Sequence, residues 1–494
     1  MKKNITALLT AVLLMSLTAG CGASGNKETE DAGTASTPYI AYDSTAQAAS
    51  EEETGEEQEE RVFHIYSSGE DFKNRVQDFY PGYEILGEDS GRIGNVRIQW
   101  HVYTDAEEYR DDLWERLSLQ ADPETVAGPD EKIDMFVVDE AYLRDYVESG
   151  YALDVEKEAG LLPEELSDQF AYTQQMATDS NGILRGVSWQ ATPGVFAYRR
   201  SIAKNVLGTD NPEKVQEAVS DWETFEETAE AVKEAGYYML SGYGDAYRVY
   251  ADNVTSAWVE EGALNIDPHL EEWAAQTREF SEQGYIHGTE LWSDEWRADH
   301  TGEGEVFGFF YSSWGIHYTL QSKAEGTTGE EDENAAVESA TGDYAVCRGP
   351  EPSHYGGQWI MAAAGTENAE LAGSIMRTLT CDKEVMKKIT QDIREFTNTV
   401  SGMTELSESD YKAEVLGGQN PIPVYLESAK LLNKRHTTVY DDDLDTGFQV
   451  TMQDYFAGKV SETDALETFR KVALSRYEEL LDTPGDEEDE QTEE

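Results

Sequence analysis

Basic residues are scarce in this chain. Its 494 residues include 37 Lys and Arg against 100 Asp and Glu, which gives a formal net charge of -63 at pH 7. Nucleic acid is excluded as a partner, because binding to phosphates draws its free energy from Lys and Arg contacts that release counterions. The same sign of charge argues against binding to anionic lipid head groups. Since the acidity runs through the middle of the chain as well as both ends, we interpret it as a solvated acidic surface.

Long apolar runs are also rare. After the N-terminal segment, no apolar run approaches the roughly 18 residues of a membrane-spanning helix. A chain that is disordered throughout is excluded as well, because 10 Trp, 27 Tyr and 15 Phe are too many for a solvated coil. The length allows two to four domains or lobes with hydrophobic cores of their own.

Catalytic and metal-binding signatures are missing. The sequence contains no GxSxG, HExxH, CxxC, Walker-type or GxGxxG motif. Its eight His are scattered, with no pair at i,i+4 spacing. The acidic run from Asp441 to Asp445 has the spacing of a calcium loop, but Thr446 replaces the required Gly and Met452 the bidentate Glu. We therefore predict neither an enzyme nor a metal or cofactor site.

Cysteine is nearly absent, with Cys21, Cys347 and Cys381 as its three occurrences. Cys21 belongs to an N-terminal motif. The other two are compatible with an exported protein but define no disulfide framework. They either pair in an oxidising compartment or remain two buried free thiols.

The N-terminus has the composition of an export signal. Lys2 and Lys3 precede an apolar run at 7–15 that is too short to span a membrane, and residues 17–21 read Leu-Thr-Ala-Gly-Cys. This sequence resembles the lipobox of bacterial lipoproteins, although Thr occupies the second position, where Leu is commoner. The resemblance implies a signal peptide at 1–20 and an acylated Cys21 that anchors the protein on the outer face of the cytoplasmic membrane. The alternative is an ordinary signal peptide with a coincidental Cys.

Three further segments have the composition of solvated chain. Residues 21–60 are rich in Gly, Ser, Thr, Ala and Glu, which predicts an acidic disordered linker. Residues 482–494 are expected to form a second acidic disordered tail. The polar stretch 326–338 is expected to be a surface insertion.

Between the linker and the tail, short strand patterns alternate with amphipathic helices, which is typical of an α/β protein. Strands are expected at 62–66, 96–100, 134–138 and 195–198. A helix is expected at 106–120, where one face carries Tyr109, Leu113 and Leu117.

Two later helices have recognisable start signals. Ser220 and Glu223 have the spacing of a capping box, and Gly236 follows as the stop. Another helix is expected to open at Ser461. The apolar faces of the two helices are Trp222, Phe225, Ala229 and Val232 in the first, and Leu466, Phe469, Val472 and Ala473 in the second.

Seven segments spread over 61–481 match, in order and spacing, the motifs of one protein family. They are 62–72, 134–139, 146–153, 186–198, 221–225, 310–315 and 355–360. Through them the chain resembles the carbohydrate-binding branch of the extracellular solute-binding proteins of bacterial ABC importers. Two positions depart from the family pattern, since Ile133 stands where Pro is usual and Arg199 where Asn is usual.

The resemblance implies an α/β, two-lobed periplasmic-binding-protein-like fold with discontinuous lobes joined by a hinge. Lobe one is expected to comprise 61–190 and 357–400, and lobe two 191–356 and 401–481. A sugar or oligosaccharide would bind in the cleft between the lobes and be delivered to the permease subunits of an ABC transporter. The resemblance implies a monomer without a cofactor. Closure of such a cleft is driven by a ligand that contacts both lobes only in the closed state.

A sugar site needs an aromatic plate under the ring, with carboxylates or amides around the hydroxyls. The aromatic candidates are Trp314, which precedes a glycine, Trp189 at the expected crossing between lobes, and Tyr355 and Trp359, which flank two glycines. Gln190, next to Trp189, is the amide candidate. Each of these aromatic residues has core packing as its alternative role.

Polar candidates follow the expected strands or lie in loops. They are Glu70, Asp139, Glu140, Tyr243, Asp245 and Asn398. Solvated surface is the alternative for each carboxylate. Two other functions stay open: a surface sensor or adhesin ectodomain of the same fold, and a secreted glycoside hydrolase that uses paired carboxylates.

Overall fold

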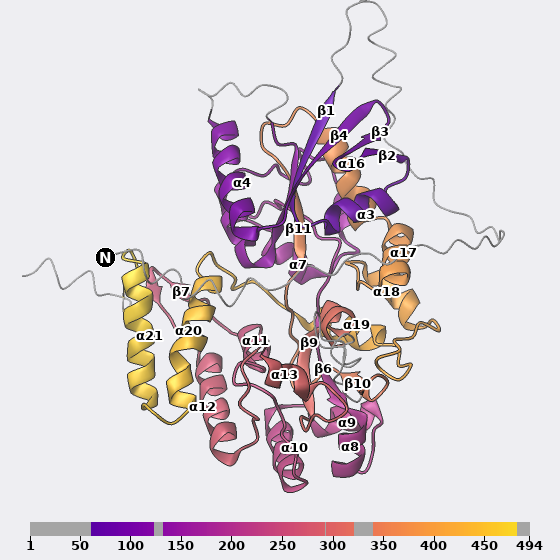
Figure 1. The fold of residues 1–494 in the computed structure, drawn as a ribbon. Coiled ribbons are helices and arrows are strands. Elements are labelled where there is room, and N and C mark those ends of the chain that lie inside the picture. The colour runs from indigo at the N-terminus through magenta and orange to yellow at the C-terminus, as the bar shows by residue number, and fades with distance from the viewer. Residues whose placement is uncertain (1–60, 123–131, 292, 321–338, 482–494) are drawn as a thin grey trace, which may run out of the picture.

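Two α/β lobes lie one above the other in the protein (Figure 1). The computed structural model describes residues 61–122, 132–291, 293–320 and 339–481. Within these ranges no helix is long and apolar enough to cross a membrane. The signal peptide, Cys21, the linker, the insertion at 326–338 and the acidic tail all lie outside the described residues.

Lobe one contains a six-stranded sheet of order β11-β5-β1-β4-β3-β2. β1 runs parallel to both β4 and β5, whereas β11 is antiparallel to β5. The near-continuous burial of β1 and β5 is typical of strands in a sheet that is covered on both faces. The strands are β1 Val62–Ser68, β2 Tyr83–Gly87, β3 Ser90–Ile93, β4 Val96–Tyr103, β5 Met135–Asp139 and β11 Gln358–Ala362.

Helices cover both faces of this sheet (Figure 1), with α4 on one face and α3 and α16 on the other. The Tyr109 hydroxyl of α4 donates to the carbonyl of Val137 at 2.6 Å and lies 3.1 Å from that of Tyr66, which places the helix on two neighbouring strands. The helices of this part are α3 Asp71–Phe79, α4 Ala106–Ala121, η2 Glu140–Tyr142, α5 Leu143–Ser149, α6 Pro163–Leu166, α7 Ala171–Met176, α16 Ala369–Thr380 and α17 Lys383–Ile393, and α18 Val400–Ser407 follows at the predicted division of the chain.

Lobe two is built on a three-stranded antiparallel sheet of order β10-β6-β9, with strands β6 Gly194–Arg199, β9 Gly308–Ser312 and β10 Tyr344–Cys347. Alternate residues of β6 enter different hydrophobic clusters: Val195 and Ala197 join one, and Phe196 and Tyr198 the other. This alternation follows from the two-residue period of a strand. The central strand is therefore buried on both faces.

Helices and a small hairpin complete lobe two. They are α8 Arg200–Val206, α9 Pro212–Ala218, α10 Trp222–Glu234, α11 Tyr247–Ala251, β7 Val259–Glu260, β8 Ala263–Leu264, α12 Pro268–Gln283, α13 Asp294–Asp299, α14 Ser313–Gly315, η3 Ile316–Leu320, α19 Ile422–Leu431, α20 Asp441–Phe456 and α21 Glu462–Arg476.

The four expected strands and the expected helix at 106–120 are confirmed, with longer bounds for most strands. Two details of the later helices were wrong. The side chain of Asp221, rather than Ser220, caps α10, and it does so with Thr224 rather than Glu223. Val472 of α21 is exposed, because α20 covers the face that carries Phe469.

Cys347 and Cys381 are free thiols. Cys347 ends β10 in lobe two, and Cys381 follows α16 in lobe one. The division of the chain at residue 400 stays a prediction, because α18 packs against both α17 and α19.

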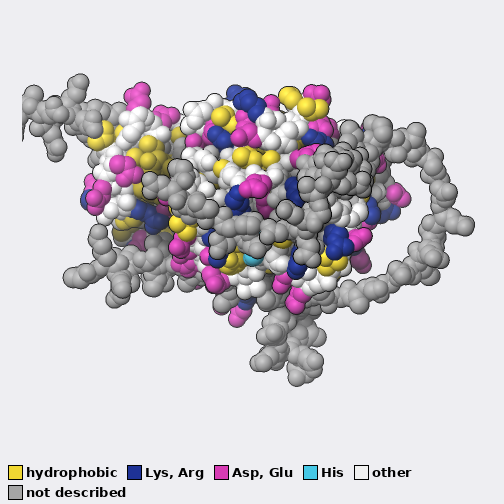
Figure 2. All heavy atoms as spheres, turned by 90° about the horizontal axis from the view of Figure 1, so that it is seen from above, with side chains coloured by type: hydrophobic (Ala, Val, Ile, Leu, Met, Phe, Trp, Pro, Cys, Tyr) yellow, Lys and Arg dark blue, Asp and Glu magenta, His cyan; other side chains and the backbone are white. Residues whose placement is uncertain are grey.

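Acidic side chains are scattered over the face seen in Figure 2, with basic side chains between them. This distribution agrees with an acidic surface in contact with solvent.

A buried ion pair lies inside lobe one. The guanidinium of Arg75 donates to both carboxylate oxygens of Glu395, at 2.9 and 2.7 Å, and both side chains are buried. The same carboxylate accepts from Trp189 Nε1 at 3.1 Å and from Gln190 Nε2 at 2.9 Å. Four donors therefore satisfy one buried carboxylate, as a charge in such a place requires.

Glu395→Gln should lower the free energy of unfolding by about 3 to 5 kcal/mol, because it leaves the buried Arg75 without its counter-charge. The control is Glu405→Gln, since Glu405 pairs with Lys383 and Lys387 at the surface and should cost less than about 1 kcal/mol. Urea unfolding of both variants measures the difference. Equal losses of unfolding free energy in the two variants would contradict the role of Glu395 as the buried counter-charge of Arg75.

Candidate functional site

Three chain segments meet where the two lobes face each other. β5 ends at Asp139 and is followed by Glu140, β11 begins at Gln358, and β9 ends at Ser312, just before Trp314. β11 pairs with β5 so that Gln358 lies opposite Asp139. This is the carboxyl end of the parallel strands of lobe one, where α/β sheets place their ligands.

Trp314 and Tyr355 form an aromatic pair at this place. Their ring centroids are 6.1 Å apart with an interplanar angle of 31°, and Trp314 Nε1 donates to the carbonyl of Tyr355 at 2.9 Å. The contact requires glycine at position 356, where φ is +74° and a Cβ would lie 3.1 Å from Trp314 Nε1. Tyr355 is 48% exposed, whereas Trp314 is partly buried.

Amide and carboxylate groups stand beside the aromatic pair on the lobe-one side. Gln358 Nε2 donates to Asp139 Oδ1 at 2.8 Å, and the Tyr142 hydroxyl donates to Asp139 Oδ2 at 2.9 Å. Gln190 Oε1 accepts from the backbone N–H of Gln358 at 3.1 Å. Burial raises the pKa of Asp139, although the hydrogen bonds from Gln358 and Tyr142 oppose the shift.

One further residue of lobe two contacts the aromatic pair and another approaches lobe one, and neither was predicted from the sequence. The guanidinium of Arg248, on α11, lies 5.3 Å from the centre of the Tyr355 ring. Tyr318 is 56% exposed, and its pKa is raised by partial burial and by Glu395 of lobe one. Arg248 is the lone basic residue between 241 and 252, and this isolated positive charge could have marked it as a site residue in the sequence. Tyr318 gave no comparable signal.

The carboxylate of Glu140 interacts with the segment 354–356 of its own chain, so it is not free for a ligand. Its Oε2 accepts from the N–H of Gly356 at 2.6 Å, and its Oε1 lies 3.4 Å from His354 Nε2. Glu140 therefore holds the segment that carries Tyr355.

The model of the bacterial extracellular solute-binding protein family matches residues 101–415. The chain belongs to this family.

Solved structures of solute-binding proteins share the fold at low sequence identity. A crystal structure described as extracellular solute-binding protein family 1 is 15% identical, covers 84% of this chain and 99% of its own, and has a TM-score of 0.68. The galacto-N-biose-/lacto-N-biose I-binding protein of an ABC transporter from Bifidobacterium longum is 13% identical, with coverages of 85% and 99% and a TM-score of 0.59. The sugar-binding protein MalE from Xanthomonas citri is 10% identical, with coverages of 84% and 98% and a TM-score of 0.61. Comparison with curated proteins gave no match.

The candidate site of this solute-binding protein includes five of the sequence-predicted residues. Trp314, Tyr355, Asp139 and Gln190 lie around Gln358 as described above. Glu70 ends the loop after β1, at the same edge of the sheet, and its side chain is largely exposed.

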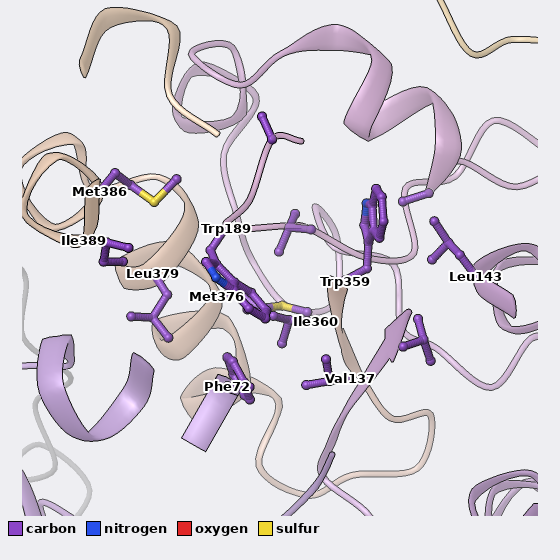
Figure 3. Packing of buried hydrophobic residues seen from close by; sticks show 14 of the residues in the cluster. Phe72, Val137, Leu143, Trp189, Trp359, Ile360, Met376, Leu379, Met386 and Ile389 are labelled. Carbon is purple, nitrogen blue, oxygen red and sulfur yellow. The ribbon is translucent and has the colours of Figure 1, made fainter. Parts of the chain in front are cut away.

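Three predicted residues lie in the core of lobe one instead and are left out of the site. Trp189, Trp359 and Asn398 are at most 1% exposed (Figure 3 shows the two tryptophans). Trp359 is adjacent to Gln358 on β11, so its side chain points to the opposite face of the sheet, where its Nε1 donates to the carbonyl of Thr173. The amide of Asn398 is likewise hydrogen-bonded to buried backbone and hydroxyl groups, and its Oδ1 accepts from the N–H of Phe170.

Tyr243 and Asp245 support the interior of lobe two. The Tyr243 ring packs on Phe456. Asp245 Oδ2 accepts from the backbone N–H groups of Ser241 and Gly242, at 2.9 and 3.0 Å, and so closes its own loop. The structure gives neither residue a contact with the aromatic pair.

Asp245 should make the stability of the protein depend on pH. Burial raises its pKa to about 6, although the two N–H donors oppose the shift. The folded protein therefore binds this proton more tightly than the unfolded chain, whose Asp titrates near 4. Protonated Asp245 therefore stabilises the folded protein fully below about pH 4, and this stabilisation is lost as the pH rises to about 6.

Replacement of Asp245 by Asn removes this titration. The free energy of unfolding of Asp245→Asn, taken relative to that of the wild type, should therefore rise by up to about 3 kcal/mol between pH 4 and pH 7. Urea unfolding of both proteins at four pH values measures the difference. A difference that is constant with pH would contradict the prediction.

Proposed function

We propose that the protein is the carbohydrate-binding component of an ABC importer and that a sugar or oligosaccharide binds between the two lobes. The observation that carries this proposal is the aromatic pair of Trp314 and Tyr355, in which Tyr355 is 48% exposed and Trp314 is partly buried. An aromatic face suits the C–H groups of a pyranose ring, and the polar groups of Asp139 and Gln358 suit its hydroxyls.

The charges around the aromatic pair favour a neutral ligand. Arg248 is the cation nearest Tyr355, and its Nη1 lies 3.5 Å from Asp445 Oδ2. Burial lowers the pKa of Arg248, but Glu140, Asp445 and Asp252 raise it above its ordinary value. Because three carboxylates already balance this guanidinium, it has little charge to offer an anionic ligand.

The relatives support binding over hydrolysis. The Bifidobacterium longum neighbour is described as a complex with lacto-N-biose, and the Xanthomonas citri neighbour as a sugar-binding protein. In the proposed mechanism the ligand contacts Trp314 and Arg248 from lobe two and Asp139 from lobe one. It therefore favours the arrangement in which both sets of contacts form.

Transport also requires a place at the membrane. We propose that Cys21 carries the lipid anchor and that residues 21–60 are the linker between the membrane and the folded lobes. The monomeric protein would deliver its ligand to the permease subunits.

Trp314→Ala should abolish the stabilisation that the correct carbohydrate gives. A ligand that binds the folded state alone raises the melting temperature by mass action, and at 100 times its dissociation constant it adds about 2.7 kcal/mol. Thermal melting of the wild type against a panel of mono- and oligosaccharides identifies the stabilising sugar, and the variant is then melted with that sugar.

The matched control is Trp114→Ala, because Trp114 is also partly exposed but lies on α4, packed against Tyr146 and Tyr151. This variant should show the same rise in melting temperature with the sugar as the wild type. Stabilisation of the wild type by peptides or polyamines and by no sugar would overturn the carbohydrate assignment.

Cys21→Ser should release the protein from cells into the medium, since the thiol is the acylation site in this proposal. The measurement is the distribution of the protein between membrane and medium. Cys381→Ser, which removes a cysteine inside the folded part, is the control and should leave the protein on the membrane. A Cys21→Ser variant that stays on the membrane would contradict the anchor.

A further inference from the structure

His354 lies between two carboxylates that belong to different lobes. It is fully buried, and neither ring nitrogen makes a hydrogen bond within the described structure. Nε2 lies 3.4 Å from Glu140 Oε1, and Nδ1 lies 3.8 Å from Asp252 Oδ2. Glu140 follows β5 in lobe one, whereas Asp252 ends α11 in lobe two. The ring thus faces a carboxylate from each side of the junction.

The same two carboxylates also hold the backbone around Tyr355. Asp252 Oδ2 accepts from the N–H of His354 at 2.5 Å, and Glu140 Oε2 accepts from the N–H of Gly356 at 2.6 Å. One hydrogen bond therefore fixes the residue before Tyr355 and the other fixes the residue after it. Since both acceptors are charged, these hydrogen bonds belong to the stronger class.

Lys434 extends the arrangement to a third chain segment. Its Nζ donates to Asp252 Oδ1 at 2.7 Å, and its backbone N–H donates to Gln175 Oε1 on α7 at 2.8 Å. Burial alone would raise the pKa of Asp252, but Lys434 and His354 lower it well below its usual range. Asp252 is therefore a buried anion that depends on these partners.

Cations and carboxylates alternate around the ring. Lys434 pairs with Asp252, and Arg248 lies 3.5 Å from Asp445 Oδ2. The Tyr172 ring, 5.4 Å from that of His354, covers the cluster on the lobe-one side.

We propose that Glu140, His354 and Asp252 are positioning residues for the carbohydrate site. Together they form an interlobe tie that holds the two lobes in the arrangement seen here and sets the place of Tyr355. Glu140 thus acts through the Tyr355 segment rather than by touching the ligand. The inference rests on the proposed function only because Tyr355 faces the ligand, and its test uses no ligand, so the two can fail separately.

The test compares Glu140→Gln, His354→Gln and the double variant with the wild type, all without added ligand. Hydrogen exchange at the Gly356 amide measures the tie directly, and the radius of gyration from small-angle scattering measures the separation of the lobes. Each single variant should exchange at least about tenfold faster and show a larger radius. The double variant should add little to either effect, because both changes break one network.

The control pair is His269→Gln and Glu351→Gln, since His269 Nε2 lies 2.9 Å from Glu351 Oε2 entirely within lobe two. These variants should change neither measurement. If His354→Gln does not fold, Glu140→Gln and Glu140→Asp carry the test, and the shorter acid should restore part of the protection. Unchanged exchange and radius, additive effects in the double variant, or equal effects in the control pair would overturn the proposal.

Discussion

The antiparallel pairing of β11 with β5 fixes where the chain returns from lobe two to lobe one. It runs from Gln358 opposite Asp139 to Ala362 opposite Met135, and the N–H of Glu140 continues it with a 3.0 Å hydrogen bond to the carbonyl of Gly357. The placement of Gln358 beside Asp139 in the candidate site depends on this register. A shift by one residue would turn Gln358 into the core and Trp359 toward the ligand.

Three of the scarce basic residues, Arg75, Lys434 and Arg199, are used inside the molecule. Arg75 neutralises Glu395 in lobe one, and Lys434 neutralises Asp252 at the junction. Arg199, which stands where the family usually has Asn, donates to Asp343 Oδ2 at 2.8 Å and to the carbonyl of Thr301 at 2.6 Å. Each of these interior cations is paired with a carboxylate, as burial demands.

Much of the fold could be predicted from the sequence, because local patterns determine it. Parallel strands buried on both faces read as apolar runs, and α4 shows its face through Tyr109, Leu113 and Leu117. The site was harder, because it depends on contacts between distant segments. Trp359 flanks the same glycine pair as Tyr355, and Trp189 lies at the expected crossing between lobes, yet both are in the core. Strand parity places Trp359 there, and Trp189 donates to the distant Glu395. Arg248 and His354 have roles that only the meeting of the two lobes creates.

The central claim is that a carbohydrate binds between the lobes against the aromatic pair. A crystal structure of the protein grown with the sugar that stabilises it most tests this claim directly. The account predicts a sugar ring against Trp314 and Tyr355, with hydroxyls toward Asp139 and Gln358. A sugar bound elsewhere on the protein, or one that touches a single lobe, would contradict it.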